Sequence, residues 1–477
     1  MKTQLTPLGA ILLSAITVWF TTAPARAQNP PGGFSFISSA RVTNGFLMNW
    51  PNAGAGTNYT VQSRDRLADS IWVTLAANQP WPTVQTQWLD STASNQLARF
   101  YRVVAVPSAT RGNILASNLV YSYSIATINS YFNYYNLGLA ATYAVNFYKI
   151  DYDTIDPLGA RIQASGALFL PQNVGKPLPL LSYQHGTTTL TNDVPSGGTS
   201  DDDIVGLIFG SAGYAAALPD YLGLGDGPGF HPYVHARTEA TACVDLLRAA
   251  RRFCASNSIP LTSQLFLAGY SQGGHATMAL HRELENYHTN EFTITASAPM
   301  AGPYDMSGVE LSDLLSARCP PNPYYYAYVI ISYQRVYALA STWSDLFAPP
   351  YATTIPQLFN GNIDGSTINL SLPACNISNI LSSALLTNLQ NDPNCPFRQA
   401  LRDNDVDQWK PVAPMHLYHC FADDQVPYAN SQVAYSNFLA RGASQVQLID
   451  PDPGANHKDG WVPCLTAAKT WFDTLKQ

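Results

Sequence analysis

One pentapeptide, Gly269-Tyr270-Ser271-Gln272-Gly273, has the residue types and spacing to present a serine as a nucleophile. The apolar residues 265–268 before it have the composition of a buried parallel strand. After it, apolar residues recur every four positions from 276 to 284, as on one face of a helix. A serine in a sharp strand-to-helix turn has a strained backbone, and side chains two positions away would collide with the adjoining elements. The sequence therefore predicts a strand, a strained turn at Ser271 and a helix.

A serine hydroxyl is a weak nucleophile, so Ser271 needs a neighbouring base, which in turn needs an acid to orient it. In α/β-hydrolases these residues follow in the chain order serine, acid, histidine. Of the nine histidines, only His457 lies beyond the last predicted strand, in a glycine-containing loop. His416 and His419 lie in or beside a strand, ahead of the acid, and are out of order. His457 is therefore the predicted base.

The acid is expected directly after the predicted strand at 415–419. The segment 418–427 contains a small residue and then Asp-x-x-Val-Pro, a pattern typical of hydrolases. Counting back from Val426-Pro427 makes Asp423 the acid, with Asp424 as the alternative. Cys420 stands where many hydrolases have glycine.

An acyl transfer at Ser271 also needs two backbone N–H groups aimed at the developing negative charge. We expect one from Gln272, at the start of the helix, and the other from Thr187, in the loop after a predicted strand at 178–183. His185 and His275 are interpreted as structural residues, and Asp220 as the anchor of a loop.

From about residue 114 onward, apolar strands alternate with amphipathic helices, which predicts an α/β domain with a mostly parallel sheet. We expect strands at 178–183, 214–218, 265–268, 293–298, 415–419 and 446–449, and a helix at 239–253. In such sheets the reactive loops follow the carboxyl ends of strands, where all the motifs fall. Residues 303–408 interrupt the alternation and contain their own helical pieces, which indicates an inserted helical cap.

The first part of the chain has a different pattern. Residues 1–27 have the charge, apolar stretch and small-x-small site of a cleaved secretory signal peptide. Residues 28–108 alternate as short strands between turns, which predicts a small all-β sandwich. This segment resembles a fibronectin type III module, with Trp50 in an early strand, a central Trp72 and a late Tyr-Arg-Val strand at 101–103. It could contact polysaccharide or protein, or serve as a spacer.

The composition of the chain limits the kinds of binding partner that we expect. Charged residues make up only 12% of the chain and the formal net charge is −7, with no Lys/Arg run, so nucleic acid and anionic lipid are not expected partners. Beyond the signal segment no stretch is apolar for long enough to span a bilayer, so we expect no integral membrane contact. Seven cysteines in an exported chain permit disulfides, and Cys375–Cys395 is the first pairing to expect. We expect Cys243 and Cys420 to be buried in core elements.

With Ser271, Asp423 and His457 in order, residues 109–477 resemble an α/β-hydrolase, and more closely the secretory lipases of the lipase A type. The resemblance rests on the segments 181–187, 213–223, 269–273 and 423–427. It implies hydrolysis of small or polymeric carboxylic esters through a serine acyl-enzyme, without metal or organic cofactor, in a secreted or periplasmic protein. The alternatives are a serine peptidase of the prolyl-peptidase type and a non-catalytic binding or adhesion protein on a hydrolase scaffold.

Overall fold

The computed structural model of the 477-residue chain describes residues 19–22, 37–64, 72–75, 81–95, 99–107, 110–198 and 200–477. Apart from 19–22, which form a strand, the predicted signal peptide at 1–27 lies outside these residues. The chain divides into two compact units, Met1–Val106 and Pro107–Gln477, and each is described by itself. None of the helices in the described ranges is both long and apolar enough to cross a membrane.

The described residues of the first unit form two small sheets. One has the order β2 (Ser38–Val42), β3 (Gly45–Asn49), β6 (Gln87–Asp90), and the other the order β1 (Trp19–Thr22), β7 (Phe100–Pro107), β4 (Thr57–Arg64), β5 (Val73–Thr74). Their buried core is aromatic and aliphatic: Met48, Trp50, Tyr59, Val61, Trp88, Tyr101 and Val103. The Tyr101 hydroxyl donates a hydrogen bond to Asp90 at 3.0 Å. Small sheets around an aromatic core fit an all-β module, and its fibronectin type III identity stays a prediction.

The second unit is organised around a single large sheet, in which the described residues contribute nine strands. The order is β16 (Val446–Ile449), β15 (Met415–Tyr418), β14 (Ile294–Met300), β13 (Leu261–Tyr270), β11 (Leu178–Gln184), β12 (Ala215–Pro219), β10 (Arg161–Pro171), β9 (Val145–Ile155), β8 (Ile114–Tyr123). Neighbours are parallel from β16 to β12 and antiparallel from β12 to β8, so the sheet is mixed and mostly parallel. All six strands predicted between 178 and 449 are present.

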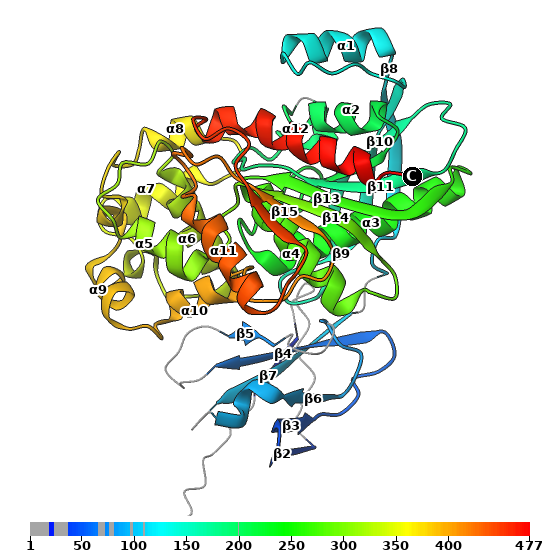
Figure 1. The fold of residues 1–477 in the computed structure, drawn as a ribbon. Helices are drawn as coiled ribbons and strands as arrows, with labels where there is room; N and C mark the ends of the chain where they lie inside the picture. Colours follow the sequence, from blue (N-terminus) through cyan, green and yellow to red (C-terminus); the bar gives the residue numbers. More distant parts are fainter. Residues whose placement is uncertain are drawn as a thin grey trace, which may run out of the picture. The chain divides into compact units, whose positions relative to one another are not determined.

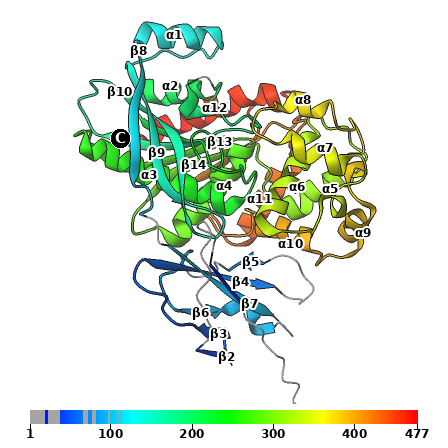
Figure 2. The ribbon, with the colours of Figure 1, turned by 180° about the vertical axis from the view of Figure 1, so that it is seen from behind.

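Helices cover both faces of this sheet (Figures 1 and 2). One face carries α1 (Ile125–Tyr134), α2 (Asp203–Ser211) and α12 (His457–Leu475), and the other carries α3 (Ala236–Ser256), α4 (Gln272–Tyr287) and α11 (Ala429–Ala440). The parallel strands are buried on both faces, which explains their nearly uninterrupted apolar sequences. Because helices cover the faces of the sheet, the strand ends and the loops that follow them are what remain to form a site.

Between β14 and β15 the chain leaves the sheet and forms a group of short helices, coloured yellow-green to orange in Figure 1. They are a π-helical turn (Met306–Glu310), α5 (Leu311–Leu314), α6 (Tyr324–Tyr337), α7 (Tyr351–Leu358), α8 (Gly365–Asn369), α9 (Ser383–Asn391) and α10 (Pro396–Asp403). We call residues 303–408 the insert. The apolar faces of its helices pack against each other, and some of their residues line the cavity described below.

The predicted disulfide Cys375–Cys395 was wrong, because Cys375 has another partner. Cys375 bonds to Cys319, 56 positions away and also in the insert, and Cys395 is a free thiol. Cys395 directly precedes α10 and has 2% of its surface exposed, so it packs into the insert's core instead of reaching across a loop. Cys243 and Cys420 are free and buried, as predicted.

Candidate active site

Ser271 lies on a tight turn between the end of β13 at Tyr270 and the start of α4 at Gln272. Its backbone has φ 61° and ψ −123°, a conformation that is strained for any residue with a side chain. The flanking glycines are required by close backbone contacts. A Cβ on Gly273 would stand 1.9 Å from the carbonyl oxygen of Gln184, and one on Gly269 would stand 2.3 Å from that of Gly273. The predicted strained turn is therefore present, with glycine at the positions where no side chain fits.

The loops after β13, β15 and β16 bring three polar side chains into one hydrogen-bonded chain. Nε2 of His457 lies 2.9 Å from the Ser271 hydroxyl oxygen, and Nδ1 of the same ring lies 2.6 Å from Oδ2 of Asp423. Ser271 and His457 retain 7% and 5% of their surface exposed. A base that touches both a hydroxyl and a buried carboxylate can remove the hydroxyl proton while the carboxylate stabilises the resulting imidazolium.

The Asp423 carboxylate is surrounded by donors. Oδ1 accepts from the backbone N–H groups of Gln425 and Val426, both at 2.9 Å, and Oδ2 also lies 3.1 Å from Nε2 of His419. Burial acts to raise the pKa of Asp423, but the hydrogen bonds from His419 and His457 outweigh it and hold the pKa well below its ordinary value. Asp423 therefore stays ionised at any working pH.

Asp424, the alternative to Asp423 as the acid, lies in a different position relative to His457. Oδ1 of Asp424 accepts from the backbone N–H of His457 at 3.2 Å, so Asp424 touches the loop of the histidine and Asp423 touches its ring. His419 was rejected as a base from its place in the chain, and the structure places it as a second donor to Asp423. Its spacing of four residues from Asp423 was the only signal in the sequence for this contact.

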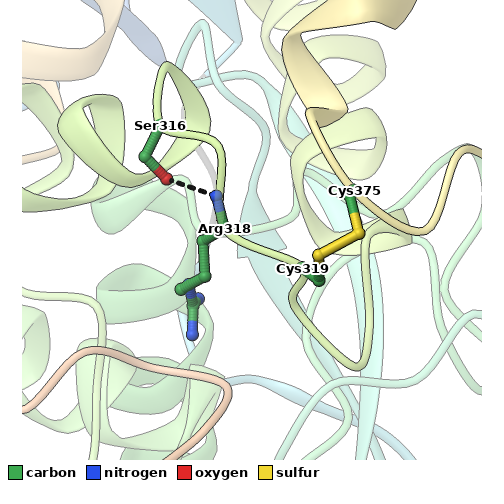
Figure 3. Close-up of a disulfide and its surroundings, with 4 residues drawn as sticks. All are labelled: Ser316, Arg318, Cys319 and Cys375. Atoms are coloured by element: carbon green, nitrogen blue, oxygen red, sulfur yellow. Dashed lines mark hydrogen bonds between the residues drawn. A yellow bond between two sulfur atoms is a disulfide. The ribbon is translucent and has the colours of Figure 1, made fainter.

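The insert reaches this acid loop through Arg318. The guanidinium donates to the carbonyl oxygens of Asp424 at 2.8 Å and Gln425 at 3.0 Å and forms an ion pair with Asp313. Figure 3 shows Arg318 next to Cys319, whose disulfide to Cys375 links this loop of the insert to a second loop. This contact could not be predicted from the sequence, because it joins segments more than a hundred residues apart.

Behind the nucleophile lies a buried network that the sequence analysis also missed. Nε2 of Gln272 donates to Oε1 of Glu239 at 3.0 Å and lies 2.8 Å from Nε2 of His231. Oε2 of Glu239 lies 2.6 Å from Nδ1 of His275, whose Nε2 donates to the Asn404 carbonyl of the insert at 2.9 Å. Burial lowers the pKa of His231 to about 3, so this ring is neutral and can accept from Gln272. The network links the start of α4 to α3 and to the insert.

The two expected oxyanion donors lie in adjoining segments. Gln272 is the first residue of α4, and the first N–H groups of a helix have no partner within the helix. The close contact of Gly273 with Gln184 places the end of β11, and hence the start of the loop that carries Thr187, against the nucleophile's turn. The Thr187 hydroxyl lies 2.9 Å from that of Tyr233, which lines the cavity at Ser271.

The residues interpreted as structural make structural contacts. Nδ1 of His185 lies 2.7 Å from the carbonyl oxygen of Gly186, and Asp220 accepts from the Ser165 hydroxyl at 2.5 Å and from the Ser196 N–H at 2.9 Å. His275 is fully buried in its contact with Glu239. Each holds a loop or a helix, and none of the three contacts Ser271 through its side chain.

A cavity opens at Ser271. Its walls are mostly aliphatic and aromatic side chains, many of them from the insert: Tyr233, Val234, Pro303, Met306, Leu311, Leu314, Tyr325, Tyr326, Val329, Ile330, Phe397, Leu401 and Val426. The remaining lining residues are polar: Ser271, Gln272, Glu310 and Gln425. A cavity with such walls suits an apolar group.

The mixed sheet with helices on both faces and a serine on a strained strand-to-helix turn defines an α/β-hydrolase. Residues 201–295 match the secretory lipase family. A ligand-bound form of the rice cell wall degrading esterase LipA from Xanthomonas oryzae is 30% identical over 76% of this chain and 96% of that one, with a TM-score of 0.69. A hydrolase from Legionella pneumophila is 29% identical over 76% and 98%, with a TM-score of 0.71.

The fold extends to more distant proteins. Candida antarctica lipase A in its closed state is 20% identical over 77% of this chain and 84% of that one, with a TM-score of 0.60, which shows the fold alone. None of the curated proteins matches the chain significantly. The chain belongs to the family of LipA-type esterases, and it is a carboxylic ester hydrolase.

Proposed function

We propose that the chain is an exported serine esterase with Ser271, His457 and Asp423 as its catalytic triad. Ser271 attacks the ester carbonyl while His457 takes its proton, and His457 then returns the proton to the leaving alcohol. The resulting acyl-enzyme is hydrolysed by water, activated by His457 in the same way. Asp423 holds the ring of His457 and stabilises its charged form. The N–H groups of Gln272 and Thr187 stabilise the negative oxygen of the tetrahedral intermediates.

One observation carries this proposal above the rest: the continuous hydrogen-bonded chain from Ser271 through His457 to Asp423, at 2.9 and 2.6 Å, at the mouth of an apolar cavity. A base within this distance of the hydroxyl meets the geometric condition for general-base catalysis. The strained backbone of Ser271 supports the same role, because strain of this kind is concentrated at functional positions.

The test is hydrolysis of p-nitrophenyl esters from acetate to palmitate by the wild type and by Ser271→Ala. Loss of a serine nucleophile typically removes about 10⁶ of kcat, so we expect turnover by the variant to fall to background. The preferred chain length separates an esterase from a lipase. Undiminished turnover by a folded Ser271→Ala variant would refute the proposal.

Export and the domain layout are part of the same proposal. A cleaved signal peptide at 1–27, a fibronectin type III-like module at 28–108 and an α/β-hydrolase domain at 109–477 with its cap at 303–408 account for the sequence patterns. The match to secretory lipases supports secretion. Because its relative LipA is a rice cell wall degrading esterase, esters carried by polysaccharide are a substrate class to test beside simple esters. N-terminal sequencing of the exported protein would check the cleavage site.

A further inference from the structure

Most polar groups on the wall of the cavity are already engaged by the protein. The hydroxyls of Tyr233, Tyr325 and Tyr326 contact Thr187, Gln425 and Asp313 respectively. These tyrosines therefore offer the cavity mainly their ring surfaces. A ligand that enters meets apolar surface until it reaches a polar atom whose hydrogen-bonding capacity is unused.

Glu310 provides such an atom. Its Oε1 accepts from Nδ2 of Asn430 at 2.7 Å, and its Oε2 receives no hydrogen bond from the described residues. The Glu310 side chain is half-buried, so protein atoms do not enclose it completely. Glu310 lines the cavity, and with Oε1 bonded to Asn430, Oε2 is the oxygen left for a ligand there.

The Glu310 carboxyl is held in place by its hydrogen bond from Asn430. Asn430 is fully buried, and its own Oδ1 accepts from the backbone N–H of Asp305 at 3.1 Å. Its Nδ2 also donates to the Pro427 carbonyl at 3.1 Å, so its amide cannot be turned without losing these bonds. A buried amide thus fixes one oxygen of Glu310 and leaves the other for a ligand.

We assign the cavity to the acyl side of the reacting ester. Its walls include Ser271 and Gln272, the nucleophile and the proposed oxyanion donor, but His457 is not among the described residues that line it. The leaving alcohol must lie within reach of His457, which returns a proton to it. The group bound in the cavity is therefore the acyl chain.

We propose, resting on the function proposed above, that Glu310 is a specificity-determining residue whose Oε2 hydrogen-bonds a hydroxyl group on the acyl chain. The preferred substrates are then esters whose acyl group has an apolar body and a hydroxyl substituent. The apolar walls bind the body, and an acyl group without the hydroxyl leaves the polar oxygen of Glu310 without a partner, which costs binding.

The charge state of Glu310 supplies a second readout. Burial raises its pKa to about 8, while the hydrogen bond from Asn430 acts in the opposite direction. The charged and titratable groups that face it are Asp313, Arg318, Tyr326 and Asp423. The carboxyl is therefore neutral at neutral pH and becomes an anion in mildly alkaline solution, where an acyl methyl group beside it is disfavoured and a hydroxyl still donates to it.

The experiment compares p-nitrophenyl esters of linear acids from butanoate to octanoate with their omega-hydroxy counterparts. The measured quantity is the ratio of kcat/KM for the hydroxylated ester to that for the plain ester. At the chain length that reaches Glu310 we expect this ratio to be about tenfold higher in the wild type than in Glu310→Leu, since one hydrogen bond contributes about that factor. Glu310→Gln, whose amide can still pair with a hydroxyl, is expected to keep most of the preference.

The same ratio measured from about pH 6 to about pH 9 is expected to rise in the wild type and to stay level in Glu310→Gln, which tests the idea even if Glu310→Leu does not fold. Equal ratios in wild type and Glu310→Leu at every chain length, or a wild-type ratio that does not change with pH, would overturn the proposal. A stronger preference for omega-amino esters would also overturn it, because it would indicate a carboxylate that binds cations. Failure of the wild type to cleave any ester would instead contradict the proposed esterase function.

Discussion

The nucleophile and the acid of the proposed triad are held in place by different means. Around Ser271 the restraint is backbone packing: a strained turn and glycines whose missing side chains let backbone atoms approach within contact distance. Around Asp423 the restraint is a set of hydrogen bonds from His419, from two backbone N–H groups and from His457, with Arg318 supporting the loop from outside.

This difference predicts how the turn at Ser271 and the loop at Asp423 each respond to substitution. A backbone turn packed against other backbone cannot relax around an added atom, so substitutions there act on the whole fold. A carboxylate with several donors loses its support one hydrogen bond at a time, so substitutions there act in graded steps on activity and on pH dependence. The predictions below test this contrast.

The largest effect is expected from Gly273→Ala. The added Cβ would stand 1.9 Å from the carbonyl oxygen of Gln184, which is backbone and cannot swing aside. We expect loss of about 3 kcal/mol or more in the free energy of unfolding, together with loss of esterase activity. Urea denaturation and p-nitrophenyl ester hydrolysis measure the two.

Gly454→Ala is the matched control. A Cβ at Gly454 would have its nearest neighbour, the Asp452 carboxylate, at 3.7 Å, so we expect little change in stability. If Gly273→Ala proved as stable and active as Gly454→Ala, backbone packing would not be what holds the nucleophile.

Asp423→Asn is expected to have the next largest effect, on activity more than on stability. An amide in place of the carboxylate no longer stabilises the charged ring of His457, and kcat should fall by about 10⁴. Asp424→Asn is the comparison, with a much smaller loss expected because the Asp424 carboxylate accepts from the backbone N–H of His457 and Asp423 contacts the ring. A greater loss in Asp424→Asn than in Asp423→Asn would reverse the assignment of the acid.

The pH dependence of stability should show a smaller effect of the same carboxylate. Its pKa is lower in the folded state than in the unfolded state, so the unfolded chain binds the proton first as the pH falls. The resulting stability is complete above the unfolded pKa of about 4 and declines below it, by about 1 kcal/mol between about pH 5 and about pH 3. Urea denaturation over this range should therefore give a shallower decline for Asp423→Asn, and identical slopes would contradict the linkage.

The smallest effect is expected from Arg318→Gln. The Arg318 side chain is 30% exposed, and its hydrogen bonds to the Asp424 and Gln425 carbonyls support the acid loop only indirectly. We expect kcat to fall about threefold with little change in KM, in line with the modest contribution of a partly exposed hydrogen bond. Arg402→Gln is the control, because Arg402 bonds to the Pro393 carbonyl within the insert. Equal losses in both variants would point to a general weakening of the insert.

The features that the sequence predicted well are those with a local pattern. The strand, turn and helix around Ser271 form one continuous segment, 261–287, and the parallel strands are short apolar runs because both of their faces are buried. The positions of Asp423 and His457 after their strands followed from chain order, and the structure places both side chains against each other, with His457 at the start of α12.

The features that could not be predicted from the sequence are contacts between distant segments of the chain. The contact of Glu239 with His275, the bonds of Arg318 to the acid loop and the pairing of Cys319 with Cys375 depend on how the insert folds, and its short helices have no long periodic pattern. The antiparallel strands β9 and β10 lie before the first strand predicted at 178 and were not assigned individually, although they pair along eleven residues. Glu310 could not be singled out either, because its importance depends on which cavity it faces.

The most direct test of the central claim is to locate the nucleophile chemically. The wild type is treated with a p-nitrophenyl alkylphosphonate, which is attacked as an ester would be but leaves a stable phosphonyl adduct, and the modified peptide is identified by mass spectrometry. We predict one adduct per active molecule, on Ser271, and none in His457→Gln, where the base is missing. An adduct on another residue, or an unmodified Ser271 in enzyme that the reagent has inactivated, would contradict the account.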